Sequence, residues 1–120
     1  MDDPEQLEIS LSKIEDSIKV QGPIHGIAGF SMGGLIAFAV AARQMPKLPL
    51  LNISGAPLTH LSKDMRKAFK LSAPSLHFLS DEDSFFSHHE LLSLSCRCLN
   101  PSLIWHVGGH TLPTLDHKVI

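Results

Sequence analysis

A glycine–serine–glycine spacing between two apolar runs is the strongest constraint on this sequence. Gly29, Ser31 and Gly33 alternate in Gly-Phe-Ser-Met-Gly, directly after one apolar run and before a second run with helical periodicity. This order predicts a strand, a tight turn and a helix. Such a turn strains the backbone of its central residue and brings strand and helix into near contact. We therefore expect Ser31 to project beyond a buried strand, with Gly29 and Gly33 as its small neighbours.

The strand–turn–helix context gives the motif a chemical meaning. A serine at such a junction is typical of the nucleophile elbow of α/β-hydrolases. The first N–H groups of the following helix would point at the oxygen of the group that the serine attacks. The backbone N–H of Met32 is therefore a candidate oxyanion donor. The alternative is a glycine-rich turn that caps an ordinary βα unit.

Length and composition restrict the class of protein. The chain has 120 residues, which suits one domain over residues 1–120. Its net charge is −2 and it has no long basic run, so nucleic acid is not an expected partner. No apolar run approaches a membrane span of about 20 residues. The acidic start argues against a targeting segment, and two cysteines are no disulfide framework. We expect a cytoplasmic protein, with the nucleus as a second location.

The remaining pattern alternates helices with short apolar strands. The sequence predicts strands over 24–30, 48–54, 75–80 and 102–107, and helices up to Gly22, over 32–44, within 58–73 and over 87–98. Asp3 is the expected N-cap of the first helix, and Asn100-Pro101 is an expected turn. Alternation of this kind predicts an α/β fold with about four parallel strands joined by right-handed crossovers.

Three chemically active residue types follow three of the predicted strands. Ser31 follows the first, Asp83 the third and His110 the fourth, and functional groups of parallel sheets gather at these carboxyl ends. A neutral serine needs a base with a pKa near working pH, which histidine supplies, and a carboxylate orients the imidazole. The order Ser, Asp, His also suits this fold. Asp81 competes with Asp83, because it lies nearer the end of its strand.

A metal centre is the weaker use of the histidines and cysteines. Cys-x-Cys is not the spacing of structural zinc sites, and adjacent histidines on a helix point in different directions. We therefore expect no metal site from the candidate ligands, which are His88, His89, Cys96, Cys98, His106 and His110.

Four ordered blocks resemble the FSH-type serine hydrolase family, over nearly the whole chain. They are Gly-Pro-Ile-His-Gly-Ile-Ala-Gly-Phe-Ser-Met-Gly at 22–33, Ile-Ser-Gly at 53–55, Pro-Ser-Leu-His at 74–77 and His-Val-Gly-Gly-His at 106–110. The resemblance implies an α/β-hydrolase fold and cofactor-free esterase chemistry on a small-molecule ester, with a Ser-Asp-His triad. The family's Gly-Glu-x-Asp falls on residues 80–83, which assigns the acid to Asp83. The family's usual Gln after the nucleophile is Met32 here, which leaves its backbone N–H in place.

The length of the chain departs from the family. Strands precede the elbow in the family, and an early loop supplies a second oxyanion N–H, whereas this chain begins at the helix before the elbow. We therefore expect the C-terminal half of the fold from an N-terminally truncated member, with the strand at 24–30 as an open edge. Such a chain would be poorly active or marginally stable. The alternative function is a catalytically impaired binding module that self-associates through this edge.

Overall fold

Four parallel strands form one sheet, in the order in which they occur along the chain. The computed structural model describes residues 4–44 and 47–113. Its strands are β1 (Ile27–Phe30), β2 (Leu50–Ile53), β3 (Leu71–Leu79) and β4 (Cys98–Trp105). Each pairs in parallel with the next, so the predicted parallel sheet is confirmed. All four carboxyl ends consequently point to one rim of the molecule.

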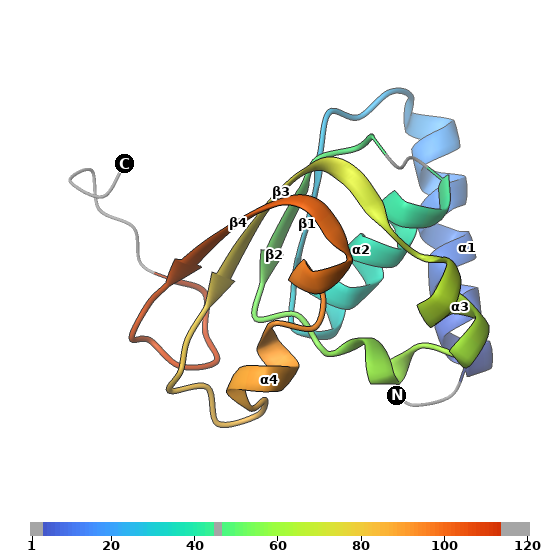
Figure 1. The fold of residues 1–120 in the computed structure, drawn as a ribbon. Helices are drawn as coiled ribbons and strands as arrows, with labels where there is room; N and C mark the ends of the chain where they lie inside the picture. Colours follow the sequence, from blue (N-terminus) through green and yellow to red (C-terminus); the bar gives the residue numbers. More distant parts are fainter. Residues whose placement is uncertain (1–3, 45–46, 114–120) are drawn as a thin grey trace.

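The helices gather on one side of this sheet. They are α1 (Pro4–Gln21), α2 (Met32–Gln44), α3 (Lys63–Ala68) and α4 (His88–Leu91). Helix α2 lies between the sheet and α1, with α3 on the same side (Figure 1). Because α2 is apolar on nearly all sides, it is buried between these layers, and its bounds are those predicted from the sequence. Asp3, the expected N-cap of α1, lies outside the described residues.

Contacts between α1 and α2 combine apolar packing with an ion pair. Leu7 and Leu11 of α1 are buried in the core. Arg43 of α2 donates hydrogen bonds to Glu15 at 2.6 and 3.1 Å and to Glu8 at 2.7 and 2.9 Å. These bonds raise the pKa of Arg43 above its ordinary value. The acidic face of α1 is therefore not simply solvated, because Glu15 is buried against this guanidinium.

The opposite face of the sheet is uncovered among the described residues. Side chains that face α2, such as Leu50, Asn52 and His77, are buried, whereas Ala28 and Phe30 on the other face are exposed. The alternation follows from the pleat, because successive side chains of a strand point to opposite faces. One face is thus a packed core, and the other carries exposed apolar side chains.

All four strand starts differ from the prediction. Strands β1 and β2 begin later, at Ile27 rather than 24 and at Leu50 rather than 48, whereas the two strands that begin earlier, β3 and β4, both contain proline. Strand β3 begins at Leu71 rather than 75, and Pro74 lies where its register with β4 shifts. Strand β4 begins at Cys98 and contains Pro101, so the predicted turn at Asn100-Pro101 does not occur. Proline is tolerated here because β4 is an edge strand of the described sheet.

The predicted helix over 87–98 is also shorter than expected. Helix α4 ends at Leu91, and a separate 3₁₀ turn covers Ser95–Arg97. The helix starts with a capping box, in which Ser87 Oγ accepts from the N–H of Glu90 and the Glu90 carboxylate accepts from the N–H of Ser87. The apolar residues behind it, Leu91 and Leu94, are buried without a continuous helix.

Candidate active site

Ser31 sits in the predicted sharp turn between β1 and α2. Its φ is +57°, a left-handed value that is uncommon for a residue with a side chain. The backbone around it is tightly bonded: its N–H donates to the carbonyl of Ile53 at 2.9 Å, and its own carbonyl accepts from Gly34 and Ala56 at 3.0 Å each. This strain is therefore held by neighbouring strands and by the first turn of α2.

The glycines of the elbow differ in whether a Cβ atom would fit at their position. A Cβ on Gly29 would collide with the backbone carbonyl of Gly33, which confirms that strand and helix nearly touch. A Cβ on Gly33 itself would meet nothing within 4 Å, so Gly33 is not needed for lack of space. The second crowded position is Gly34, where a Cβ would lie 2.5 Å from the side-chain oxygen of Asn52. The sequence pattern thus identified the right turn but the wrong second glycine.

His110 joins the serine to a carboxylate. Its Nε2 lies 2.9 Å from Ser31 Oγ, and its Nδ1 lies 2.7 Å from Asp83 Oδ2. With the proton on Nδ1 donated to the carboxylate, Nε2 is free to accept the hydroxyl proton of the serine. The side chain of His110 is only 9% exposed. The three residues, which come from three strand ends, therefore form one hydrogen-bonded chain.

Asp83 is the acidic residue that reaches the histidine. Its carboxylate is fully buried, and its second oxygen accepts the N–H groups of Phe85 at 2.8 Å and Phe86 at 2.9 Å. Burial raises the pKa of Asp83, but the hydrogen bonds from His110, Phe86 and Phe85 outweigh it and keep the pKa below its ordinary value. The carboxylate therefore stays charged at neutral pH.

Asp81 has a different partner. Its Oδ1 lies 2.6 Å from Nδ1 of His88, and both side chains are exposed. The ring of His88 in turn stacks on Trp105, with 4.9 Å between centroids. The structure therefore places the competing acid outside the chain formed by Ser31, His110 and Asp83.

Aromatic rings surround the imidazole of His110. Phe30, Phe85 and Phe86 have ring centroids 5.0, 4.6 and 5.3 Å from it. Phe85 is 71% exposed and Phe30 is 36% exposed, so the rim beside the hydroxyl of Ser31 is apolar and open. Met32 begins α2 next to this rim, where the first N–H groups of a helix have no intrahelical acceptor.

Sequence reasoning missed a buried polar cluster beneath the elbow. His77 is fully buried, with Asn52 Nδ2 2.9 Å from its Nδ1 and Ser75 Oγ 2.9 Å from its Nε2. Burial lowers the pKa of His77 to about 4, so the ring is neutral. The sequence held one signal for this cluster, because His77 and Asn52 each stand within an apolar stretch predicted as a buried strand. A polar side chain in such a strand needs a hydrogen-bond partner, and the two residues face each other across β2 and β3.

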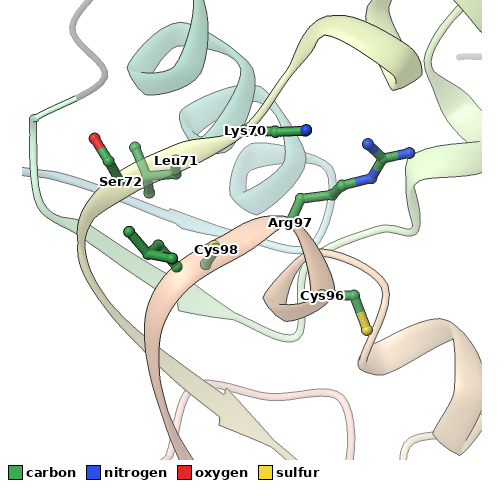
Figure 2. A pocket seen from close by; sticks show the side chains of 7 residues that line it. Lys70, Leu71, Ser72, Cys96, Arg97 and Cys98 are labelled. Atoms are coloured by element: carbon green, nitrogen blue, oxygen red, sulfur yellow. The ribbon is translucent and has the colours of Figure 1, made fainter.

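One pocket of the described chain lies away from these residues. It has a volume of about 540 Å³ and lies at the starts of β3 and β4, lined by Lys70–Ser72 and Cys96–Leu99 (Figure 2). No member of the serine–histidine–aspartate chain lines it. The described residues also contain no group of three or more candidate ligands that could hold a metal ion. None of their helices is both long and apolar enough to cross a membrane.

Comparison with known proteins identifies the family. Residues 1–120 match the family described as serine hydrolase (FSH1). The chain belongs to this serine hydrolase family. Human esterase OVCA2 is 32% identical over an alignment of 115 residues, which covers 89% of this chain and 51% of that protein. Mouse esterase OVCA2 is 30% identical over an alignment of 114 residues, which covers 89% of this chain and 50% of that protein.

Solved structures give the same fold. Est1E from Butyrivibrio proteoclasticus superposes with a TM-score of 0.69 and 16% identity, over 87% of this chain and 62% of that protein. The expected α/β-hydrolase fold, with four parallel strands and flanking helices, is therefore confirmed for this member of the FSH1 family. The chain spans about half the length of the curated relatives that it matches.

Proposed function

We propose that this chain carries the catalytic residues of a serine esterase that cleaves small-molecule carboxylic esters. The observation that carries this proposal is the hydrogen-bonded chain from Ser31 through His110 to Asp83. Family membership supports the same class of chemistry. The exposed rings of Phe30 and Phe85 beside the serine favour an apolar acyl group over a sugar.

The reaction would proceed in two stages through an acyl-enzyme. Ser31 Oγ attacks the ester carbonyl while Nε2 of His110 takes its proton, and the backbone N–H of Met32 stabilises the negative oxygen. His110 then gives the proton to the departing alcohol. In the second stage His110 takes a proton from water as the water oxygen attacks the acyl carbonyl. His110 then gives this proton to Ser31 Oγ as the bond between Oγ and the acyl carbon breaks, which releases the acid and restores the serine. Asp83 keeps the imidazole oriented and stabilises its charged form throughout.

Fluorophosphonate labelling tests this role of Ser31 directly. The purified chain would be treated with the probe and analysed by intact and peptide mass spectrometry. We expect one adduct on Ser31, none in Ser31→Ala, and an unchanged adduct in Ser87→Ala, which removes an exposed hydroxyl from a helix cap. An adduct that persists in Ser31→Ala would contradict the proposal.

A second candidate function is a binding module with impaired catalysis. Strand β1 pairs with β2 alone among the described strands, and the sheet face that includes Ala28 and Phe30 is exposed and apolar. An open strand edge is a template for pairing with another chain. Size-exclusion chromatography with light scattering would show association, whereas rapid labelling of Ser31 in a monomer would contradict this second candidate.

A further inference from the structure

One buried hydroxyl connects two segments of the candidate site. The histidine loop is residues 106–111, which include His110, and the acid turn is residues 80–83, which end at Asp83. Ser80 follows β3 directly and is fully buried. Its Oγ accepts the backbone N–H of Gly109 at 3.0 Å and that of Glu82 at 3.2 Å. Gly109 precedes His110, and Glu82 precedes Asp83. The same oxygen is therefore bonded next to both residues whose side chains meet at 2.7 Å.

Few other hydrogen bonds attach the histidine loop to the rest of the molecule. The ladder between β3 and β4 ends where the N–H of His106 donates to the carbonyl of Leu79 at 2.8 Å. Apart from the bonds of the imidazole and the bond to Ser80, the hydrogen bonds that the described structure shows for residues 107–111 stay within residues 106–111. Ser80 is thus the backbone attachment of this loop beyond the end of the ladder.

The conformation of Gly109 makes that attachment specific. Its φ is +72°, a left-handed value that glycine adopts without strain. The position where a Cβ would stand lies 3.4 Å from the carbonyl oxygen of Glu82, so the loop passes close to the acid turn. Without an acceptor, the N–H of Gly109 would lose its partner in a partly buried position, which is costly.

We propose that Ser80 is a positioning residue: its hydroxyl fixes the histidine loop against the acid turn, so that the imidazole reaches both Ser31 and Asp83. This inference rests on the proposed function of these three residues. We call the two hydrogen bonds that Ser80 Oγ accepts, from the N–H groups of Gly109 and Glu82, the clasp.

The test compares two buried serines in the full 120-residue chain. Ser80→Ala removes the clasp, whereas Ser95→Ala removes a buried hydroxyl that donates to Leu92 at 2.8 Å, away from the site. The measurements are the rate of fluorophosphonate labelling, hydrogen exchange of the Gly109 amide by NMR and the imidazole chemical shifts of His110. Thermal unfolding of both variants reports the general effect of losing a buried hydroxyl.

We expect Ser80→Ala to slow labelling by about 10- to 100-fold, the scale of a small misplacement of a reacting group. Exchange at Gly109 should accelerate at least about 10-fold as its hydrogen bond is lost, and the His110 signals should move. Ser95→Ala should lower thermal stability without any of these changes. Unchanged Gly109 exchange and His110 shifts in Ser80→Ala, or equal changes in Ser95→Ala, would overturn the proposal.

Two further arms keep the result decisive. If Ser80→Ala does not fold, Ser80→Cys retains the side-chain volume with a weaker acceptor. Gly109 exchange faster than in the unmodified chain would then support the clasp, while an unchanged rate would overturn it. If the unmodified chain is not labelled at Ser31, the proposed function fails. The NMR measurements then still decide whether Ser80 positions His110.

Discussion

The carboxylate of Asp83 lies 2.7 Å from Nδ1 of His110, although the two residues are 27 positions apart in the chain. This contact fixes which nitrogen of the imidazole carries the proton. Since Nδ1–H donates to the carboxylate, Nε2 presents a lone pair to Ser31. Whether His110 can accept the hydroxyl proton of Ser31 therefore depends on Asp83, which does not contact the serine.

Asp83→Asn should slow fluorophosphonate labelling of Ser31 on the order of 10⁴-fold, as in comparable triads. The amide oxygen can still accept from the N–H groups of Phe85 and Phe86, so the fold should persist. Its NH₂ would then face Nδ1 and move the proton to Nε2, which can no longer accept from the serine. Asp81→Asn is the matched control and should leave the rate nearly unchanged, because Asp81 bonds to His88. Equal losses in both variants would refute this assignment.

Burial of His77 should make the free energy of unfolding depend on pH between about 4 and 6.5. The pKa of His77 is lowered to about 4 in the folded chain, against about 6.5 when unfolded. Only the unfolded state takes up this proton in that window, so stability is full above pH 6.5 and falls as pH drops toward 4. The contribution approaches about 1.4 kcal/mol per pH unit.

Urea unfolding at several pH values, with His77→Gln and His89→Gln compared, measures this slope. His77→Gln should lose it, while His89→Gln should keep it because His89 is exposed. A slope that survives in His77→Gln would show that another group is responsible.

Protonation of Asp83 should lower the free energy of unfolding in more acidic solution. Its folded pKa lies below the ordinary value of about 3.9, so its contribution is present above that pH and is lost as pH falls through the folded pKa. Acid titration followed by circular dichroism should show a shallower loss of stability below pH 4 in Asp83→Asn than in the unmodified chain. Parallel curves would argue against a charged, hydrogen-bonded carboxylate at this position.

Two adjacent glycines at the start of α2 should respond to alanine in opposite directions. Gly34→Ala would place a Cβ 2.5 Å from the oxygen of Asn52 and 2.9 Å from Cα of Gly55, and we expect a loss of about 1–3 kcal/mol. Gly33→Ala meets nothing within 4 Å and should gain up to about 1 kcal/mol from helix propensity. Thermal unfolding of the two variants measures the difference, and equal destabilisation would contradict the packing described for Gly33.

Local sequence signals predicted some features of this fold better than others. The elbow and the limits of α2 could be read from the sequence, because an apolar run between a glycine-rich turn and Met45-Pro46 leaves few alternatives. The stretch Asn100-Pro101 was misread, because turn propensity carries no information about whether a strand lies at the edge of a sheet. The clasp of Ser80 was beyond prediction, since its partner Gly109 lies 29 positions away and the contact depends on how two loops meet.

The choice between the two acids shows the same limit. Distance from the strand end favoured Asp81 and the family pattern favoured Asp83, and both lie on one turn. Only the path of the chain after β3 decides which carboxylate turns inward. Asp83 does so because the N–H groups of Phe85 and Phe86 hold its other oxygen.

The proline in β4 limits how copies of this sheet can join. Within the described residues, the two free edges belong to β1 and β4, and Pro101 removes an amide donor from β4. Growth of a filament needs two competent edges, one to receive the next copy and one to offer it. Pairing through β4 would lack the hydrogen bond that an amide at Pro101 could donate, so β1 would be the stronger edge for joining a second copy. A single missing amide would then favour a pair of copies over a growing filament.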